Sequence, residues 1–153
     1  MSDISGLAQS ILDYEFDGDA SVAPLTSISG WVSSHVGELN TLIHTSFEVS
    51  GNHVTPTGSF CAEEESIMRA MYLKSFNNSM SRKTLQGATT SSDFIQIRDA
   101  DGSMIVRPNK TTAAGVYRSL SSSYADELGK LVNSYISFQT KPVQVAGKDA
   151  PSG

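Results

Sequence analysis

Apolar and polar residues follow one another along most of this chain with the period of a helix: the apolar ones recur every third or fourth position and share one helical face. The first such stretch is short and covers residues 3–14, and a longer one covers about 24–47. Pro24 suits the first turn of that second helix, where its missing N–H costs nothing. Further stretches cover about 61–85 and 112–139. The pattern predicts a mainly α protein, a bundle of three to four helices.

The last of these stretches has the most regular apolar pattern. It begins at Thr111 or Thr112, either of which can cap a helix with its hydroxyl, and continues to about Gln139. Its large apolar residues approximate the heptad of packed helices: Tyr117, Leu120, Tyr124, Leu128, Leu131, Tyr135 and Phe138. We expect this stripe to pack in the core of the bundle. Because the helix is longer than its partners, we expect Tyr135 and Phe138 to be exposed for a second contact.

One β-strand signal stands before this last helix. Two short apolar runs, at 94–97 and 104–106, flank the sequence Asp99-Ala100-Asp101-Gly102. An Asp-Gly pair between two β-prone runs is a strong local sign of a hairpin. The sequence therefore predicts a β-hairpin at about residues 94–107.

The remaining connections are rich in Gly, Ser, Thr and Pro. By composition, residues 50–60 are predicted to be a loop. The C-terminal residues 140–153 contain two prolines and no long apolar run, so we expect an extended tail there. At 153 residues the chain is most simply one domain. We predict a helical-bundle domain over 1–139, with the hairpin inserted before its long last helix, and then the tail.

Charge changes this picture, because it is segregated along the chain. Residues 1–65 contain ten carboxylates and no lysine or arginine, and the first positive residue is Arg69. The rest of the chain has eleven Lys and Arg against six acids, so the two parts carry −10 and +5 within a net charge of −5. Such segregation suits a subunit whose acidic face meets the basic face of an identical neighbour, or one that must repel an anion.

Few residues are candidates for chemistry. The run Glu63-Glu64-Glu65 could hold a divalent cation, but consecutive helical residues point about 100° apart, so we favour interaction with the helix dipole. Asp99-Ala100-Asp101-Gly102-Ser103 resembles part of a calcium loop but lacks its later glutamate, which favours a hairpin turn. The soft-ligand candidates have no zinc-site spacing: His35, His44, His53 and Cys61.

Nucleophilic catalysis is also weakly supported. Cys61 is the only cysteine, and no local sequence supports its pairing with a histidine. A cysteine beside Phe60 is more often simply packed. Glycine-rich motifs that bind phosphate are absent from the sequence. We therefore predict no enzyme activity, no metal and no cofactor.

The remaining signals concern nucleic acid, membrane and location. The basic residues of the second half are spread out rather than clustered with aromatics, so sequence-specific nucleic-acid binding is not expected. No stretch approaches the roughly 18 consecutive apolar residues of a membrane helix, so we expect no membrane partner. The start of the chain lacks the pattern of a secretion signal, which predicts synthesis in a cytoplasm.

The order of the elements resembles that of the head–tail connector (adaptor) proteins of tailed bacteriophages. The matching parts are helices 24–47 and 61–85, the hairpin Phe94–Arg107, the helix Thr112–Gln139 and the tail Thr140–Gly153. The likeness covers most of the chain and lies in architecture, not in a signature motif.

This resemblance implies a structural protein of the virion neck, at the head–tail interface. Family members form a ring under the portal and place their C-terminal tails in the portal ring. The resemblance therefore implies a homo-oligomeric ring, expected to be a dodecamer, with the portal protein and tail or neck proteins as partners. It would link capsid to tail and form part of the conduit for genome ejection, and DNA would pass without sequence-specific binding.

The same resemblance, with the charge pattern, suggests an interface. An acidic lining keeps a duplex from adhering to a conduit, and a flexible tail can become ordered on another protein. The expected interface residues are Glu38, Glu63, Glu64, Glu65, Arg107, Tyr135, Phe138, Lys141, Pro142, Val143 and Val145.

Three alternatives stay open. Another neck, tail-completion or head-decoration protein would have the same kind of composition and order of elements. A small helical regulatory or effector protein would bind one partner through the Tyr/Leu stripe and would be a monomer or dimer. An enzyme using Cys61 or a carboxylate cluster would lose activity on a single substitution.

Overall fold

The protein is mainly helical. The computed structural model describes residues 3–90, 96–98, 104–106 and 110–140, with side chains for residues 3–86 and 112–140. In chain order its elements are α1 (Ile4–Glu15), α2 (Leu25–Ile43), β1 (Glu48–Ser50), β2 (His53–Thr55), α3 (Ala62–Thr90), β3 (Gln96–Arg98), β4 (Met104–Val106) and α4 (Lys110–Gln139). The prediction of a mainly helical bundle is confirmed, with four helices in the described ranges.

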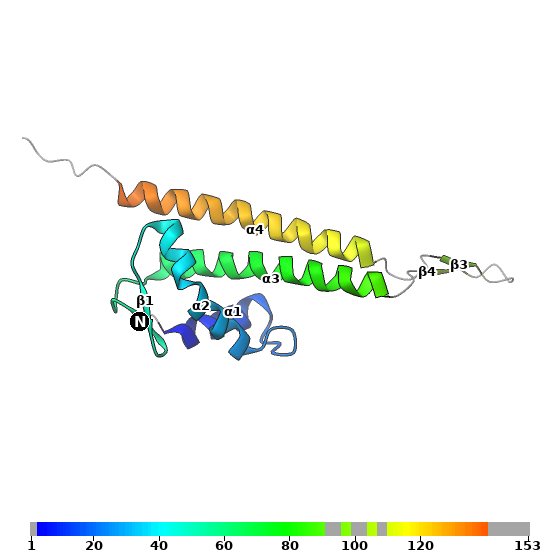
Figure 1. The fold of residues 1–153 in the computed structure, drawn as a ribbon, viewed down its shortest axis with the longest axis horizontal. Helices are drawn as coiled ribbons and strands as arrows, with labels where there is room; N and C mark the ends of the chain where they lie inside the picture. Colours follow the sequence, from blue (N-terminus) through cyan, green and yellow to red (C-terminus); the bar gives the residue numbers. More distant parts are fainter. Residues whose placement is uncertain (1–2, 91–95, 99–103, 107–109, 141–153) are drawn as a thin grey trace, which may run out of the picture.

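The two longest helices, α3 and α4, lie side by side along their length, and α1, α2 and the β1–β2 hairpin lie against part of this pair (Figure 1). The helices α1 and α2 cover the half of α3 that follows its N-terminus. Beyond Phe76 the pair continues without them; we call residues 77–90 of α3 and 110–120 of α4 the arm. No described residue of the arm belongs to the main hydrophobic core.

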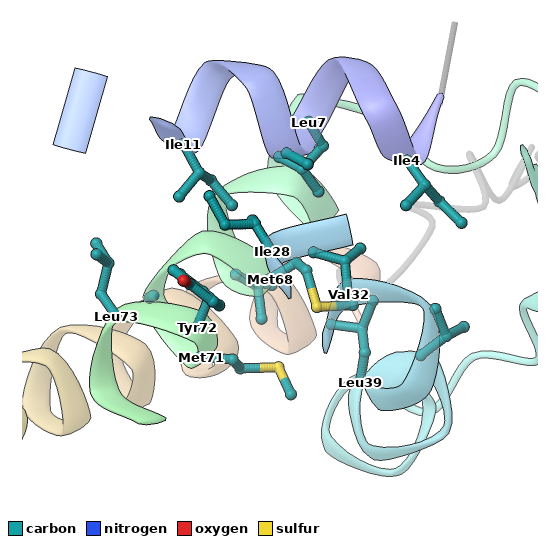
Figure 2. Close-up of a cluster of buried hydrophobic side chains, with 14 of the residues drawn as sticks. Ile4, Leu7, Ile11, Ile28, Val32, Leu39, Met68, Met71, Tyr72 and Leu73 are labelled. Carbon is teal, nitrogen blue, oxygen red and sulfur yellow. The ribbon is translucent and has the colours of Figure 1, made fainter. Parts of the chain in front are cut away.

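The core lies between α1, α2 and the first half of α3 (Figure 2). The apolar positions that predicted the first helix are all buried there: Ile4, Leu7, Ile11 and Leu12. On α2 the predicted positions from Ile28 to Ile43 are buried as well. Each such side chain contributes roughly 1.5–3 kcal/mol by leaving water. Because these helices bury the faces that their spacing indicates, their positions follow from the sequence pattern.

The end of α2 differs from the prediction. The helix stops at Ile43 rather than near residue 47, and His44 takes a left-handed conformation with φ of 57°. The side chain of Asn40 explains the stop: its Nδ2 donates to Phe47 O at 2.8 Å, and its Oδ1 accepts from Phe47 N at 2.9 Å. One amide side chain thus holds the reversed backbone and leads it into β1.

A β-hairpin between α2 and α3 is the main correction to the predicted fold. Residues 50–60 were predicted to be a loop, but β1 and β2 pair antiparallel, with Glu48 opposite Thr55. Val54 of this hairpin is buried in the core, and Ile4 N donates to Asn52 O at 2.9 Å, which ties the hairpin to α1. The signal was missed because a three-residue strand with one buried side chain has almost no period to detect.

The hairpin predicted at 94–107 is described only in part. The strands β3 and β4 pair antiparallel, with Ile97 opposite Ile105, and their connecting residues 99–103 lie outside the described residues. The fold-class prediction placed the hairpin of the fold before the last helix, whereas the hairpin that packs into the core is β1–β2.

The seam of α4 also departs from the predicted stripe. Leu120 was placed in the stripe, but it is 42% exposed. The residue in the seam is Ser121, whose Oγ donates to Lys74 O on α3 at 3.0 Å. The contacting positions step by three and four without interruption: Ala114, Tyr117, Ser121, Tyr124, Leu128, Leu131 and Tyr135. The heptad pattern includes small residues such as Ser121. The prediction used only large apolar side chains and therefore placed Leu120 in the contact instead of Ser121.

Candidate partner-binding groove

The beginning of α3 and the end of α4 form an apolar groove, which we call the end groove. Its apolar walls are Ile67 from α3 and Leu131, Tyr135 and Phe138 from α4, and its volume is about 690 Å³. Phe138 is 68% exposed, so a large aromatic ring stands at the mouth of the groove. Exposed aromatic surface beside a hollow is typical of a site that binds another protein segment.

Cys61 caps the helix that forms one wall of this groove. Its backbone N–H donates to Glu64 Oε2 at 2.8 Å, and its carbonyl accepts from Glu65 N at 3.0 Å. This is half of a capping box, in which the acid three residues into the helix reaches back to the cap. The Sγ of Cys61 donates to Gly58 O at 3.3 Å. The cysteine is exposed rather than packed, whereas its neighbour Phe60 is buried, so the expectation of a packed Cys61 was wrong.

Glu64 is the residue that joins the two helices at the groove. It is only 5% exposed, and its Oε1 accepts a hydrogen bond of 2.7 Å from the hydroxyl of Tyr135. With Cys61 N on Oε2, both carboxylate oxygens have a donor. A buried carboxylate needs such donors because it has lost its water, and the positive end of the α3 dipole favours it further.

Tyr135 is held in its neutral form by this arrangement. Burial, together with the hydrogen bond to Glu64 and the charge of Glu64, raises the pKa of Tyr135 to about 12. The phenol therefore remains a proton donor at physiological pH. Glu64, Tyr135, Ser59 and Gln139 also line a second hollow beside Phe47, so the Glu64–Tyr135 bond stands between two cavities.

Some of the predicted interface residues meet in the end groove. Glu63, Tyr135 and Phe138 line it. Glu64 also lines it but is buried and fully hydrogen-bonded, so it does not offer an exposed charge to a partner. Glu65 is half-buried on the same turn of α3.

Other predicted interface residues lie elsewhere. Glu38 lines a small cavity between α2, α3 and α4, together with Trp31, His35 and Lys74. The imidazole of His35 stacks on Trp31, with ring centroids 3.9 Å apart. The remaining predicted interface residues lie outside the described residues: Arg107, Lys141, Pro142, Val143 and Val145.

The sequence carried one unused signal for the groove. Cys61 and Glu64 have the spacing of a capping box with cysteine in the place of serine or threonine, and that spacing turns Glu64 back towards the backbone of Cys61. The partnership of Glu64 with Tyr135 had no signal, because the two residues are 71 positions apart.

The chemistry available to the described part of the chain is limited. Within it, no three residues of the His, Cys, Asp and Glu types gather in a way that could hold a metal ion. None of its helices is both long and apolar enough to cross a membrane.

Comparison with protein-family models, curated proteins and solved structures found no match to this chain.

Proposed function

We propose that this protein is a structural subunit of the head–tail connector of a tailed bacteriophage. Copies of it would form a ring below the portal, a dodecamer by the resemblance, that links the capsid to the tail and forms part of the DNA conduit. It would be made in the host cytoplasm, be located in the virion neck and act without enzymatic chemistry or a cofactor.

The end groove is the observation that carries this proposal. It lies where α4 ends at Gln139, so the chain continues into residues 141–153 from the same end of the molecule. An apolar contact surface beside the point where the chain leaves α4 suits a subunit that must join a different protein there. In the connector arrangement this partner is the portal protein.

The acidic part of the chain supports a conduit. Of the ten carboxylates in residues 1–65, seven are exposed, and no lysine or arginine lies among them. A surface of this kind repels the phosphate backbone and gives DNA no counterion-releasing contacts. It would let a duplex pass without adhering.

A second candidate is a small helical protein that binds one partner through the end groove. The exposed Phe138 beside the buried Glu64–Tyr135 pair favours it independently of any ring. It differs from the connector in predicting a monomer or dimer with no affinity for a portal protein. Another neck or tail-completion role would differ in its ring symmetry and in the neighbour of the tail.

The deciding experiment measures assembly. The full chain would be studied by light scattering and negative-stain imaging, alone and mixed with portal protein of a tailed phage. Rings, or a complex that forms only with the portal, are the expected result. A chain ending at Thr140 is the control: it should keep the helical fold and lose portal binding. A stable monomer that ignores the portal contradicts the connector and supports the second candidate.

A further inference from the structure

We infer that two charged surfaces of this protein bind each other between neighbouring copies. One is the acidic corner, Asp13, Asp17 and Asp19; the other is the basic face, Lys74, Arg82 and Arg118. This inference rests on the proposed function, since it names the self-contact from which the ring would be built.

The acidic corner is a fixed structure. Phe16 lies between its acids and packs edge-on against Phe76 and Tyr72, with ring centroids 4.8 and 6.3 Å apart. A Cβ built on Gly18 would be 4.0 Å from Asp13 Oδ1, so the carboxylate of Asp13 lies close to the turn that contains Asp17 and Asp19. All three acids are exposed.

One acid of the corner, Asp19, has its charged form stabilised by neighbouring groups. Hydrogen bonds from the Ser21 hydroxyl and backbone lower the pKa of Asp19. Asp13 Oδ1 accepts a hydrogen bond from Gln9 Nε2 at 2.8 Å. The corner therefore presents three exposed carboxylates at the end of α1 and on the turn that follows it.

The basic face lies where the arm begins. Lys74 and Arg82 are eight residues apart on α3, so they share one side of the helix over about 12 Å. Arg118 joins them from α4, because two bonds set the register of the helices: Ser81 Oγ to Ala114 O at 3.1 Å and Ser121 Oγ to Lys74 O at 3.0 Å. Arg118 is therefore level with the turn between Lys74 and Ser81.

Lys74, Arg82 and Arg118 lie on the side of the α3–α4 pair that faces away from the end groove. Ser66 and Ala70 of α3 line cavities with Glu127 and Leu131 of α4, on the flank that includes the groove. Lys74 lines the cavity on the other flank, beside α2. Arg118 precedes the half-buried Ala125 by one heptad, on that other flank of α4.

The basic face has no ion-pair partner among the described residues. The side chains of Lys74, Arg82 and Arg118 make no hydrogen bond or ion pair with any described residue. No carboxylate occurs in the described stretches 66–90 and 110–125. Glu38 of α2 lines a cavity with Lys74, but among the described residues no carboxylate forms an ion pair with any of these three positive charges.

The arm, which presents Arg82 and Arg118, is held together weakly. Its buried residues are small or polar: Asn77, Ser81 and Ala114. A two-helix hairpin with such a seam buries little apolar surface, so contact with another body would stabilise it. A partner that covers one side of the arm would provide this.

A second copy of the chain is the partner that the charges favour. The corner and the face carry −3 and +3, and they lie on different parts of the molecule, so their contact is head-to-tail and can close into a ring. DNA is a weaker match. Three positively charged side chains neutralise few phosphates, and the whole chain has a net charge of −5.

Charge reversal tests the contact. The double variants Arg82→Glu/Arg118→Glu and Asp17→Lys/Asp19→Lys should each weaken self-association of the full chain by at least about tenfold, measured by analytical ultracentrifugation. Lys83→Glu/Lys130→Glu is the control. It changes the net charge as much as the first variant does, but at exposed positions outside the basic face. It should assemble like the wild type.

Mixing the two charge-reversed variants decides the matter, because their altered surfaces are again complementary and assembly should return. Circular dichroism of each variant would establish that it is folded. If the wild type assembles and both variants assemble equally well, this inference falls while the connector proposal stands. If variants of the basic face assemble normally but lose DNA retention, the partner is nucleic acid and the inference is overturned. A wild type that never assembles, with or without portal protein, contradicts both.

Discussion

The hydroxyl of Tyr135 donates a 2.7 Å hydrogen bond to Glu64 Oε1 and so joins the end of α4 to the beginning of α3. The acceptor is almost completely buried, and its other oxygen is engaged by Cys61 N–H, the cap of the helix. The carboxylate of Glu64 therefore caps α3, joins α3 to α4 and lines the end groove.

Removing the Tyr135 hydroxyl should destabilise the protein. In Tyr135→Phe one oxygen of the buried Glu64 loses its donor, which costs about 1–3 kcal/mol of unfolding free energy. Urea denaturation measures the change. Tyr14→Phe is the control, because Tyr14 is 79% exposed and should leave the stability unchanged. Equal stability of Tyr135→Phe and the wild type would show that Glu64 does not depend on this bond.

The same bond predicts a loss of stability in strong alkali. The pKa of Tyr135 rises from 10.0 to about 12 in the folded protein, so the unfolded chain loses this proton at lower pH than the folded one. The stabilisation is complete below pH 10 and is lost as the pH rises towards 12. The unfolding free energy, measured against pH, should fall more steeply over that interval for the wild type than for Tyr135→Phe. Parallel curves would refute this.

Two neighbouring acids on α3 should respond differently to the same change. Glu63→Lys replaces an exposed side chain and removes a favourable dipole interaction worth about 0.3–1 kcal/mol. Glu64→Lys removes the acceptor for both Cys61 and Tyr135 and places a cation at the positive end of the helix, so it should cost at least about 2 kcal/mol. Thermal denaturation of both variants measures this. Similar costs would mean that Glu64 is not the structural residue of the pair.

The corrected seam of α4 can be tested with one substitution at two leucines. Leu128 is 8% exposed and Leu120 is 42% exposed. Leu128→Ala should cost about 2–4 kcal/mol through lost burial and a cavity, and Leu120→Ala less than about 1 kcal/mol. The difference would be measured by chemical denaturation. Equal losses of stability in the two variants would instead support the predicted apolar stripe, in which Leu120 packs against α3.

The end groove predicts a variant that folds but binds poorly. Phe138→Ser changes an exposed ring, so it should leave the unfolding free energy within about 0.5 kcal/mol of the wild type. It should nevertheless weaken portal binding, measured by biolayer interferometry. The control is Val116→Ser, which removes an apolar side chain that is 55% exposed on the arm. Unchanged binding by Phe138→Ser would remove the groove from the portal contact.

Local spacing was enough for much of the helical architecture. The apolar steps of the first two helices place their buried residues correctly, because those helices pack one face each against a single core. The acidic start of α3 was predicted from charge, since the helix dipole acts on adjacent residues alone. The segregation of acids and bases is also a property of the sequence, and the fold keeps it as an acidic body with a basic arm.

Tertiary contacts decided the rest. Asn40 ends α2 by bonding to Phe47, and one buried side chain, Val54, fixes the hairpin in the core. The seam of α4 passes through Ser121 because Lys74 O offers it an acceptor on the facing helix. Each of these features depends on a single side chain or on a partner that is distant in the sequence. The period of apolar residues along the chain therefore does not predict it.

The end groove shows the same division. The sequence by itself determined its components: a helix that starts near Cys61 with three acids, and a long helix that ends in aromatic residues. Only the fold decided that Glu64 would turn inward to Tyr135 while Phe138 stayed exposed. The physical reason is that burying a carboxylate requires donors from both helices at once, and residues 71 positions apart become neighbours only when those helices pack.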